Sequence, residues 1–251
     1  MTDGIIIQAR SGSTRLPAKI LLPFDEHRRI IDIILENISR NCPGKKIVLA
    51  TTDKPADDRI ADIASHAGVL CYRGSENDVL SRFIGAAETF GIDRLIRVCS
   101  DNPFLRADSF AQLFSAHDAD PDADYVAFAF PDGRPTIKSH LGLYAELTTA
   151  DALRRAASDT REQLYIEHVT IYLYTHPDKF RCRFLPLPAA VSNRTDIRLT
   201  LDTQSDFDIL RRLYHEFDNA PDQSVDALMA LIDANPDYGR IMKQNIQQNE
   251  K

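Results

Sequence analysis

Apolar and polar positions along the chain follow two repeating patterns, one typical of buried strands and one typical of amphipathic helices. Continuous apolar runs indicate strands covered on both faces, and apolar residues spaced by three and four indicate helices with one buried side. The predicted strands lie at residues 5–7, 46–51, 69–72, 94–99, 125–130 and 198–201. The predicted helices lie at residues 30–42, 55–67, 76–90, 108–117, 203–217 and 224–234.

Strands and helices alternate over the first 130 residues, which predicts an α/β fold with a doubly wound, mostly parallel sheet. From residue 131 to residue 188 this alternation breaks. We therefore expect a single domain spanning 1–251 with an inserted arm at about 131–188. The elements predicted for the arm are a strand at 137–147, a helix at 148–158 and a strand at 179–187. The Gln- and Asn-rich end after Arg240 has little to bury, and we expect it to fray.

Length and charge narrow the functional classes. The chain has 251 residues and a formal net charge of -7 at pH 7, which argues against non-specific binding of nucleic acid. It shows no signal-peptide pattern and no long apolar run, so we expect a cytoplasmic protein that does not act at a membrane. An anion site in such an acidic chain must be built locally, from a few well-placed cations.

Basic residues gather directly after the first predicted strand. Arg10, Arg15 and Lys19 follow the apolar run 5–7, with Ser13 among them. Open α/β sheets bind ligands at the carboxyl ends of their strands, and arginine and lysine bind phosphate oxygens. The segment therefore predicts a polyphosphate site, although a solvated basic loop has the same composition. It matches neither of the glycine-rich phosphate motifs GxxxxGK[ST] and GxGxxG.

Acidic residues provide a second candidate site. Asp101 follows the predicted strand 94–99 and precedes Pro103 closely. A carboxylate at this position either points into a cleft at the sheet edge or caps the next helix. Asp-x-Asp triplets between Asp118 and Asp124 resemble the metal motif of many glycosyltransferases. They lie in a loop between a helix and a strand, so we do not expect them to hold a catalytic metal.

The string Arg-x-x-Ser-x-Arg-Leu-Pro-x-Lys at 10–19 resembles the nucleotide-binding loop of sugar-activating cytidylyltransferases. The chain is most similar to the spore-coat polysaccharide cytidylyltransferase-like family, which is related to the CMP-sialic acid and CMP-KDO synthetases. This resemblance implies a nucleotide-diphospho-sugar transferase fold, a Rossmann-like sheet of the GT-A type. It covers nearly the whole chain through four motifs in the expected order.

The resemblance assigns the triphosphate of CTP to the 10–19 loop and the cytosine to the ends of the next two strands. The residues implied in CTP binding are Ala9, Arg10, Ser13, Arg15, Lys19, Ala50, Thr51, Thr52, Arg73 and Ser75. Arg10, Arg15 and Lys19 are also implied in catalysis. Ser75 has an alternative role as a cap of the helix that begins near Glu76.

Two carboxylates match the family's magnesium ligands. Asp101 corresponds to the Asp of a Gly-Asp-x-Pro motif, with Ser100 in place of the glycine, and Asp202 corresponds to the Asp of Leu-Asp-Thr-x-x-Asp. The resemblance therefore implies that both are catalytic and bind Mg²⁺. Because the carboxyl ends of strands converge on one cleft in such a sheet, we expect the two side chains to meet there.

The phosphate loop departs from the family at one position. The family usually reads Leu-Pro-Gly-Lys, and this chain has Ala18 between Pro17 and Lys19. A positive φ at this position would cost an alanine roughly 1 kcal/mol. We expect instead that the loop accommodates Ala18 at an ordinary φ.

The arm at 131–188 resembles the family's insertion on the substrate side, which also forms the dimer contact in the related synthetases. The residues implied in acceptor binding are His140, Glu146, Glu167 and His168. We expect a homodimer through the arm, because its apolar content exceeds what an exposed excursion needs. The residues behind this expectation are Leu141, Leu143, Tyr165, Ile171, Tyr172, Leu173, Tyr174 and Phe180.

These inferences combine into a predicted reaction. A Mg²⁺-dependent cytidylyltransferase would move CMP from CTP to a sugar or sugar acid, either a nonulosonic-acid-like compound or another polysaccharide precursor, and release pyrophosphate. The acceptor oxygen would attack the α-phosphorus in line, so the protein supplies positioning and charge. Two alternatives stay open, namely a GT-A glycosyltransferase that uses a nucleotide-sugar and a non-catalytic nucleotide-binding subunit.

Overall fold

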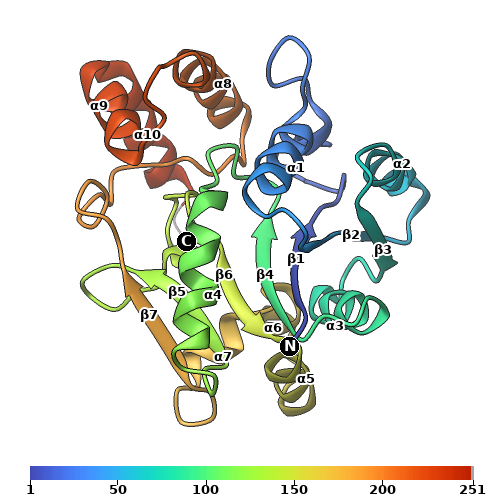
Figure 1. The fold of residues 1–251 in the computed structure, drawn as a ribbon. Coiled ribbons are helices and arrows are strands. Elements are labelled where there is room, and N and C mark those ends of the chain that lie inside the picture. Colours follow the sequence, from blue (N-terminus) through green and yellow to red (C-terminus); the bar gives the residue numbers. More distant parts are fainter. Residues whose placement is uncertain (250–251) are drawn as a thin grey trace.

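A seven-stranded sheet with helices on both faces forms the centre of the computed structural model, which describes residues 1–249 (Figure 1). The strand order is β3-β2-β1-β4-β6-β5-β7, and β6 is antiparallel to both of its neighbours whereas the other described pairs are parallel. The strands are β1 (Asp3–Gln8), β2 (Lys46–Thr52), β3 (Leu70–Gly74), β4 (Arg94–Cys99), β5 (Tyr125–Ala129), β6 (Glu146–Thr149) and β7 (Cys182–Pro186). The predicted doubly wound, mostly parallel α/β sheet is confirmed.

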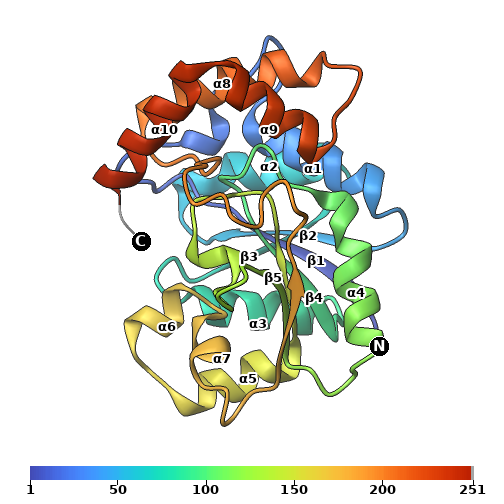
Figure 2. The same cartoon turned by 90° about the vertical axis from the view of Figure 1, so that its left-hand side faces the viewer.

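The helices form two layers with the sheet between them (Figure 2). One layer contains α1 (Ile30–Asn41), α2 (Asp58–His66), α4 (Phe110–Asp118), α8 (Gln204–Asp218), α9 (Val225–Ala234) and α10 (Pro236–Gln248). The other contains α3 (Val79–Thr89), α5 (Ala150–Asp159), α6 (Gln163–Glu167) and α7 (Ile171–Thr175). Short 3-10 turns lie at Lys19–Leu21, Pro55–Asp57, Ala107–Ser109 and Thr136–Lys138.

Strand β4 shows why the central strands read as continuous apolar runs. Ile96 and Val98 belong to the core on the side of α1, whereas Leu95 belongs to the core on the side of α3 and α5. Helices cover both faces, so successive side chains are buried on opposite sides. Arg97 interrupts the run on the face of Leu95, and it is only 6% exposed.

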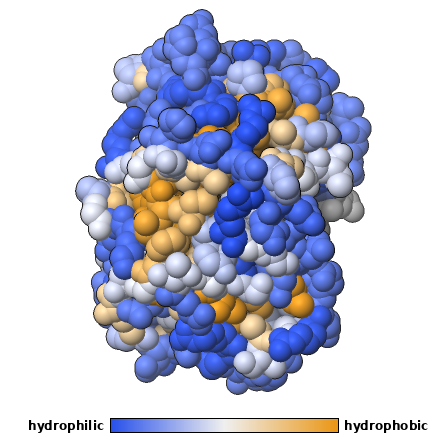
Figure 3. All heavy atoms as spheres, turned by 90° about the vertical axis from the view of Figure 1, so that its right-hand side faces the viewer, coloured by the Kyte–Doolittle hydropathy of each residue, from blue (hydrophilic) through white to orange (hydrophobic). Residues whose placement is uncertain are grey.

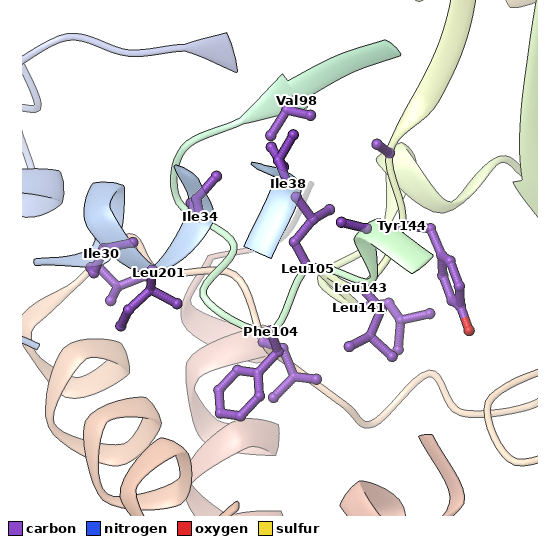
Figure 4. Close-up of a cluster of buried hydrophobic side chains, with 14 of the residues drawn as sticks. Ile30, Ile34, Ile38, Val98, Phe104, Leu105, Leu141, Leu143, Tyr144 and Leu201 are labelled. Carbon is purple, nitrogen blue, oxygen red and sulfur yellow. The ribbon is translucent and has the colours of Figure 1, made fainter. Parts of the chain in front are cut away.

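A cluster of hydrophobic side chains lies beneath the carboxyl end of β4 (Figure 4). It joins Ile30 and Ile34 of α1 to Val98 of β4, to Phe104 in the segment that follows, and to Leu201. Phe104 and Leu201 are both buried. Because these two residues lie next to the Asp101 and Asp202 regions of the chain, the cluster fixes the backbone on which those carboxylates stand.

The predicted strand at 198–201 is wrong, because this segment joins no sheet. It runs alongside two other segments instead. The N–H of Leu199 donates to the carbonyl oxygen of His140 at 2.9 Å, and the N–H of Leu201 donates to that of Asp101 at 2.9 Å. These two bonds hold the segment beside the carboxyl end of β4, although the segment is not a strand of the sheet.

Gly142 allows this close approach. Its φ is +64°, and a Cβ at this position would come within 2.8 Å of the carbonyl group of Leu199. A side chain would therefore push away the segment that leads to Asp202. The same turn explains why the predicted strand at 137–147 is wrong in extent, since β6 begins only at Glu146.

The arm at 131–188 is integrated into the fold, contributing β6 and β7 to the sheet and α5, α6 and α7 to one layer. Most of the apolar residues that suggested an exposed interface are buried inside the chain, because they belong to its two cores. These are Leu141, Leu143, Tyr172, Leu173 and Phe180. These five residues are therefore not exposed to a second copy of the chain.

The chain end after Arg240 does not fray as expected. Helix α10 continues to Gln248, and both Tyr238 and Met242 are buried in the core beneath it. Asn245 of the same helix is 3% exposed. We expected fraying because few residues of this helix are apolar. Tyr238 and Met242 nevertheless face the core and anchor the helix.

Strands β3 and β7 form the two edges of the sheet. Figure 3 shows the side of the molecule that carries α2, β3 and α3, where hydrophobic residues gather in separate patches within a mostly hydrophilic surface. Leu70 of β3 and Phe184 of β7 are exposed apolar residues on these edges. Within residues 1–249, the helices are too short or too polar to cross a membrane.

Ala18 has a φ of 52°, in the left-handed region, so the expectation of an ordinary φ is wrong. Its N–H donates to the carbonyl oxygen of Ser11 at 3.0 Å, and its own carbonyl accepts from the N–H of Leu21 at 2.8 Å. These bonds close the phosphate loop onto the 3-10 turn that carries Lys19. The backbone turn that positions this lysine thus costs the alanine about 1–2 kcal/mol.

Replacing Ala18 by glycine should raise the free energy of unfolding by roughly 0.5 kcal/mol, since the relieved strain exceeds the added chain entropy. Ala61→Gly in the interior of α2 is the matched control, and it should lower the same quantity by about 1 kcal/mol. Urea denaturation measures the free energy of unfolding of both variants and of the parent protein. A comparable decrease of this free energy in both variants would show that position 18 is not strained.

Candidate active site

Two carboxylates and one ammonium group meet at the carboxyl edge of the sheet. The Nζ atom of Lys19 lies 3.2 Å from Oδ2 of Asp101 and 3.1 Å from Oδ1 of Asp202. It also donates to the carbonyl oxygen of Leu201 at 2.6 Å. The structure thus brings together residues from the loop after β1, the end of β4 and the segment before α8.

The charges around Lys19 and Asp202 shift the pKa of each of these two groups toward its ionised form. Burial alone lowers the pKa of Lys19, but the carboxylates of Asp101 and Asp202 outweigh it and raise the pKa above its ordinary value. Burial alone raises the pKa of Asp202, but Lys19 and two arginines outweigh it and hold the pKa below its ordinary value. The ammonium group therefore offsets the repulsion between two carboxylates that share one small space.

The arginines of the phosphate loop lie around this cluster. Arg15 places Nη2 3.0 Å from Oδ1 of Asp202 and donates from Nη1 to Oδ1 of Asn249 at 3.0 Å. Arg10 lies 3.8 Å, through Nη2, from Oε1 of Glu167 in α6. The side chain of Arg15 is half exposed, so it is free to turn toward a ligand.

Asp57 holds the phosphate loop in shape, although the sequence indicated no role for it here. It is buried and accepts hydrogen bonds from the N–H of Ser11 at 2.8 Å, from the hydroxyl of Ser11 at 2.5 Å and from the hydroxyl of Thr52. An aspartate just after a proline in a predicted first helical turn looks like a residue that favours a helix N-terminus. Its side chain instead ties the end of β2 to the loop after β1.

A second cluster, more deeply buried, supports Asp202. The guanidinium of Arg198 donates to the two oxygens of Asp206 at 2.7 Å each and to Oδ2 of Asp202 at 3.3 Å. Asp206 also accepts from the backbone N–H of Asp202 at 3.0 Å and from Nδ2 of Asn245 at 2.9 Å. The backbone and side chain of Asp202 are thus both held by the Arg198–Asp206 pair, which α10 supports in turn.

His140 is neutral because of the same arginine. Its Nδ1 atom lies 2.5 Å from Nη1 of Arg198, and an arginine has only donors to offer. Nδ1 therefore accepts, and the ring proton stays on Nε2. In this tautomer Nδ1 of His140 is the acceptor and Nε2 is the donor of the ring.

Neither predicted metal carboxylate caps a helix. Thr203 caps α8 and forms the predicted capping box with Asp206, so Asp202 lies outside the helix. Helix α4 begins after Ser109, well beyond Asp101. Ser75 accepts from the N–H of Asp78 at 3.0 Å, while Asp78 itself caps α3, so the capping role considered for Ser75 is wrong.

The residues implied in cytosine binding lie at the ends of β2 and β3. Thr51 is fully buried there, next to Ala50 and Thr52. Arg73 donates from Nε to the carbonyl oxygen of Thr52 at 3.0 Å. Their backbone groups border the loop that carries Arg10 on the side away from Asp202, which is compatible with a base beside the triphosphate.

Arg82 of α3 lies beneath these residues and was not indicated by the sequence. It is 1% exposed and donates from Nη1 to the carbonyl oxygen of Ser75 at 2.6 Å, while Nε and Nη2 have no partner among the described residues. Burial, reinforced by the charge of Arg10, lowers the pKa of Arg82 to about 10. The only sign of Arg82 in the sequence is a charged residue on the apolar face of the predicted helix at 76–90.

A cavity of about 530 Å³ extends from the two carboxylates along the arm. Its lining includes Asp101, Asp202, Arg15, Arg97, Lys138, His140, Glu167, His168 and Tyr174. Three of the four residues implied in acceptor binding therefore face this space. The fourth, Glu146, is 2% exposed and does not line the cavity.

The acidic loop at 118–124 lies at the opposite ends of the strands. Asp118 pairs with Arg94 at the start of β4, with a distance of 2.5 Å, and Asp124 pairs with Arg155. These carboxylates are thus neutralised by arginines far from Lys19. Across residues 1–249, no group of three or more acidic, histidine or cysteine side chains is arranged to hold a metal.

The Arg198–Asp206 pair should make stability depend on pH. Burial alone raises the pKa of Asp206, but Arg198 outweighs it and holds the pKa below its ordinary value of 3.8. Such a carboxylate stabilises the fold above its unfolded pKa, and the stabilisation is lost as the pH falls through the lower folded pKa. Asp206→Asn should therefore cost roughly 3 kcal/mol near neutral pH, by leaving Arg198 short of a counter-charge.

The cost of Asp206→Asn should shrink as the pH falls below about 4, because the parent then loses the same ion pair. Urea unfolding of parent and variant across the acidic and neutral range measures this difference. A cost that stays constant with pH would contradict the assignment. Asp237→Asn, which removes an exposed carboxylate paired with Arg240, is the control and should leave the profile unchanged.

Comparisons with known proteins point to one family. The family model described as "Cytidylyltransferase" matches residues 4–232. The spore coat polysaccharide biosynthesis protein SpsF of Bacillus subtilis (strain 168) is 34% identical over 237 residues, covering 92% of this chain and 94% of that protein. The uncharacterized protein MJ1063 of Methanocaldococcus jannaschii is 35% identical over 243 residues, covering 97% and 95%.

Solved structures show the same likeness. A cytidylyltransferase from Leptospira borgpetersenii serovar Hardjo-bovis (strain JB197) has a TM-score of 0.82 at 30% identity, over 97% of both chains. A CMP:2-keto-3-deoxy-manno-octonic acid synthetase solved in complex with CTP has a TM-score of 0.64 at 17% identity, over 86% of this chain and 99% of that one. The second likeness shows a shared fold.

Proposed function

Because the chain belongs to the cytidylyltransferase family, we propose that it transfers the CMP of CTP to an oxygen of a sugar or sugar acid and releases pyrophosphate. Membership makes the protein a nucleotidyltransferase. The names of two similar proteins, one a spore coat polysaccharide biosynthesis protein and one a CMP-sugar-acid synthetase, support a sugar-type acceptor. CTP and a small acceptor are then its partners.

One observation carries this proposal, namely the cluster of Lys19, Asp101 and Asp202 at the mouth of the cavity. Arg15, which contacts Asp202, and Arg10 of the same loop suit a triphosphate. Asp101, Asp202 and Arg15 also line a space large enough for a small organic acceptor. The cluster therefore stands where a nucleotide and an acceptor would meet.

The chain's own residues position the reaction rather than form a covalent intermediate. The acceptor hydroxyl oxygen bonds to the α-phosphorus and loses its proton, and the bond from that phosphorus to the β-phosphate oxygen breaks. Arg10, Arg15 and Lys19 hold the triphosphate and neutralise the charge that grows on the leaving pyrophosphate. Asp57 keeps the loop of these cations in place through Ser11.

The two carboxylates fit a divalent cation, and we propose Mg²⁺. Asp101 and Asp202 already share one positive charge, the ammonium of Lys19, so this pair of carboxylates favours a cation beside it. Magnesium binds one or two carboxylates and completes its shell with waters and substrate phosphates. When bound, it would supply charge neutralisation at the α-phosphate.

The two alternatives have less support than cytidylyl transfer. A GT-A glycosyltransferase would be expected to use an Asp-x-Asp triplet, but Asp118 and Asp124 pair with arginines at the far ends of the strands. A non-catalytic subunit would be expected to lack a carboxylate or a phosphate-binding cation. Asp101, Asp202 and Lys19 are all present and in contact.

Pyrophosphate release from CTP tests the proposal directly. With a panel of sugars and sugar acids, CTP should support release while ATP, GTP and UTP should bind at least about tenfold more weakly, a difference of roughly 1.4 kcal/mol. Calorimetric titration of the four nucleotides gives the binding part. Equal or tighter binding of a purine triphosphate, or sugar transfer from a nucleotide-sugar, would overturn the assignment.

Asp101→Asn and Asp202→Asn should each keep the fold and most of the CTP affinity while reducing turnover by about a hundredfold or more. Magnesium should raise the melting temperature of the CTP-bound parent and of neither variant. Thr203→Ala, which removes only the cap of α8, is the control and should lose about 1 kcal/mol of stability with turnover retained. Normal turnover in both Asn variants would show that neither carboxylate acts in catalysis.

We also propose a homodimer through the arm, supported now only by the apolar residues of the arm that remain exposed. The arm still exposes Leu164 of α6 at 50% and Phe184 of β7 at 40%. Light scattering at micromolar concentration should give twice the chain mass of 28.3 kDa, and Phe184→Glu should shift the protein toward the monomer. A monomer mass for the parent protein would refute the proposal.

A further inference from the structure

The ammonium group of Lys19 is fully used by the protein, although the proposed function assigns it to the triphosphate. An ammonium group has three N–H donors. Three acceptors lie around this one, namely Oδ2 of Asp101 at 3.2 Å, the carbonyl oxygen of Leu201 at 2.6 Å and Oδ1 of Asp202 at 3.1 Å. The side chain is only 13% exposed. In this arrangement Lys19 therefore has no donor left for a phosphate oxygen.

Asp202 is occupied in a similar way. Its Oδ1 atom, an oxygen with two lone pairs, lies 3.1 Å from Nζ of Lys19 and 3.0 Å from Nη2 of Arg15. Its Oδ2 atom accepts from Nη2 of Arg198 at 3.3 Å. Three cations thus surround a carboxylate that the proposed function assigns to a divalent cation. A metal ion at this carboxylate would compete with them for its oxygens and would be repelled by their charge.

These three cations differ in how firmly the protein holds them. Arg198 is fully buried and donates to both oxygens of Asp206, so its position is fixed. The side chain of Arg15 is half exposed. Lys19 carries its charge at the end of a flexible four-carbon stem, with donors that rotate freely. Lys19 and Arg15, both in the phosphate loop, are therefore the cations that can leave Asp202.

Their departure keeps every charge paired only if a cation and a polyphosphate arrive together. A divalent cation alone would displace Lys19 and leave its mostly buried ammonium without a counter-charge. A triphosphate alone would draw the ammonium away and leave Asp101 and Asp202 to repel each other. A nucleotide in complex with its metal ion supplies both partners, since the phosphates suit the loop cations and the metal suits the carboxylates.

We propose that Lys19 is an intramolecular competitor of the divalent cation. It pairs with Asp101 and Asp202 until a metal–triphosphate complex binds, and this contact keeps a free divalent cation from loading the site. The inference rests on the proposed cytidylyl transfer, which assigns a metal to the two carboxylates and the triphosphate to the loop. It has one consequence that a plain phosphate ligand would not have: removal of Lys19 should strengthen the binding of free metal while weakening that of CTP.

Manganese binding without nucleotide tests the competition, because Mn²⁺ prefers the same oxygen ligands as Mg²⁺ and is counted directly by electron paramagnetic resonance. Lys19→Met should bind Mn²⁺ at least about tenfold more tightly than the parent, since the competing charge is gone. Adding Asp101→Asn should abolish this gain, which places the ion at the carboxylates. With Mg²⁺ present, Lys19→Met should bind CTP about tenfold more weakly. An unchanged or weaker affinity of Lys19→Met for Mn²⁺ would overturn the inference.

Two matched variants separate competition from the general effect of charge. Lys19→Arg keeps a positive charge at position 19 and should leave the Mn²⁺ affinity within about twofold of the parent. Lys138→Met removes an exposed ammonium from the lining of the same cavity. Because exposed charges are screened, it should also stay within about twofold. An equal gain in Lys19→Met and Lys138→Met would reveal only a long-range effect of charge, against the inference.

The parent protein decides the question if Lys19→Met does not fold. In protein labelled at lysine nitrogen, the ammonium signal of Lys19 is identified by its loss in Lys19→Arg. This signal should stay in place at a Mg²⁺ concentration that shifts it once CTP is also present. A shift with Mg²⁺ alone as large as the shift with both ligands, or no shift with both, overturns the inference.

The outcomes separate this inference from the proposed function. Pyrophosphate release that persists in the parent while Lys19→Met gains no affinity for Mn²⁺ overturns the inference and leaves the proposed function standing. Absence of pyrophosphate release with every acceptor overturns the proposed function. The Mn²⁺ titration then still decides whether Lys19 competes with a divalent cation for the two carboxylates.

Discussion

The ammonium group of Lys19 is the contact on which the candidate site depends. It joins a residue of the first loop to carboxylates that lie 82 and 183 positions further along the chain. Three segments must be placed correctly for this contact to form, and each is anchored separately. Gly142 leaves room for the segment that leads to Asp202, and the hydrophobic cluster anchors the segments of Asp101 and Asp202 through Phe104 and Leu201. The left-handed turn at Ala18 positions Lys19.

The contact also explains why so much charge is buried nearby. Two neighbouring carboxylates repel each other, and cations stabilise them. Each buried cation in turn needs a counter-charge and hydrogen-bond partners. Arg198 supports Asp202, Asp206 supports Arg198, and Asn245 supports Asp206. The interior on this side of the sheet is therefore a connected polar network, in which a change at one member is felt by the others.

The sequence predicted the sheet and the convergence of its strand ends because both follow from local patterns. Apolar runs and helical spacing identify the elements, and a parallel sheet brings their carboxyl ends to one edge. The sequence did not predict the roles of Asp57 and Asn245, because each acts through a contact that is distant in the chain. In a local pattern, Asp57 looks like part of a helix start and Asn245 like part of a polar tail.

Arg97 lies between these two cases. A charged residue in the middle of a buried strand is visible in the sequence as an interruption of an apolar run, and this one is followed four positions later by Asp101. What the pattern could not show is its partner, since Glu146 comes from an antiparallel strand in a section where the regular alternation of strands and helices has ended. The fold alone makes that pairing visible.

Helix α10 has a consequence for where this protein can be cut. The segment matched by the family model ends at residue 232, four residues before α10 begins. A chain trimmed to that boundary would retain every residue predicted to perform chemistry, but it would lose Asn245, which supports Asp206, and Asn249, which contacts Arg15. The segment that defines the family therefore ends before the segment that the candidate site needs. Helix α10 lies outside the first and belongs to the site's support.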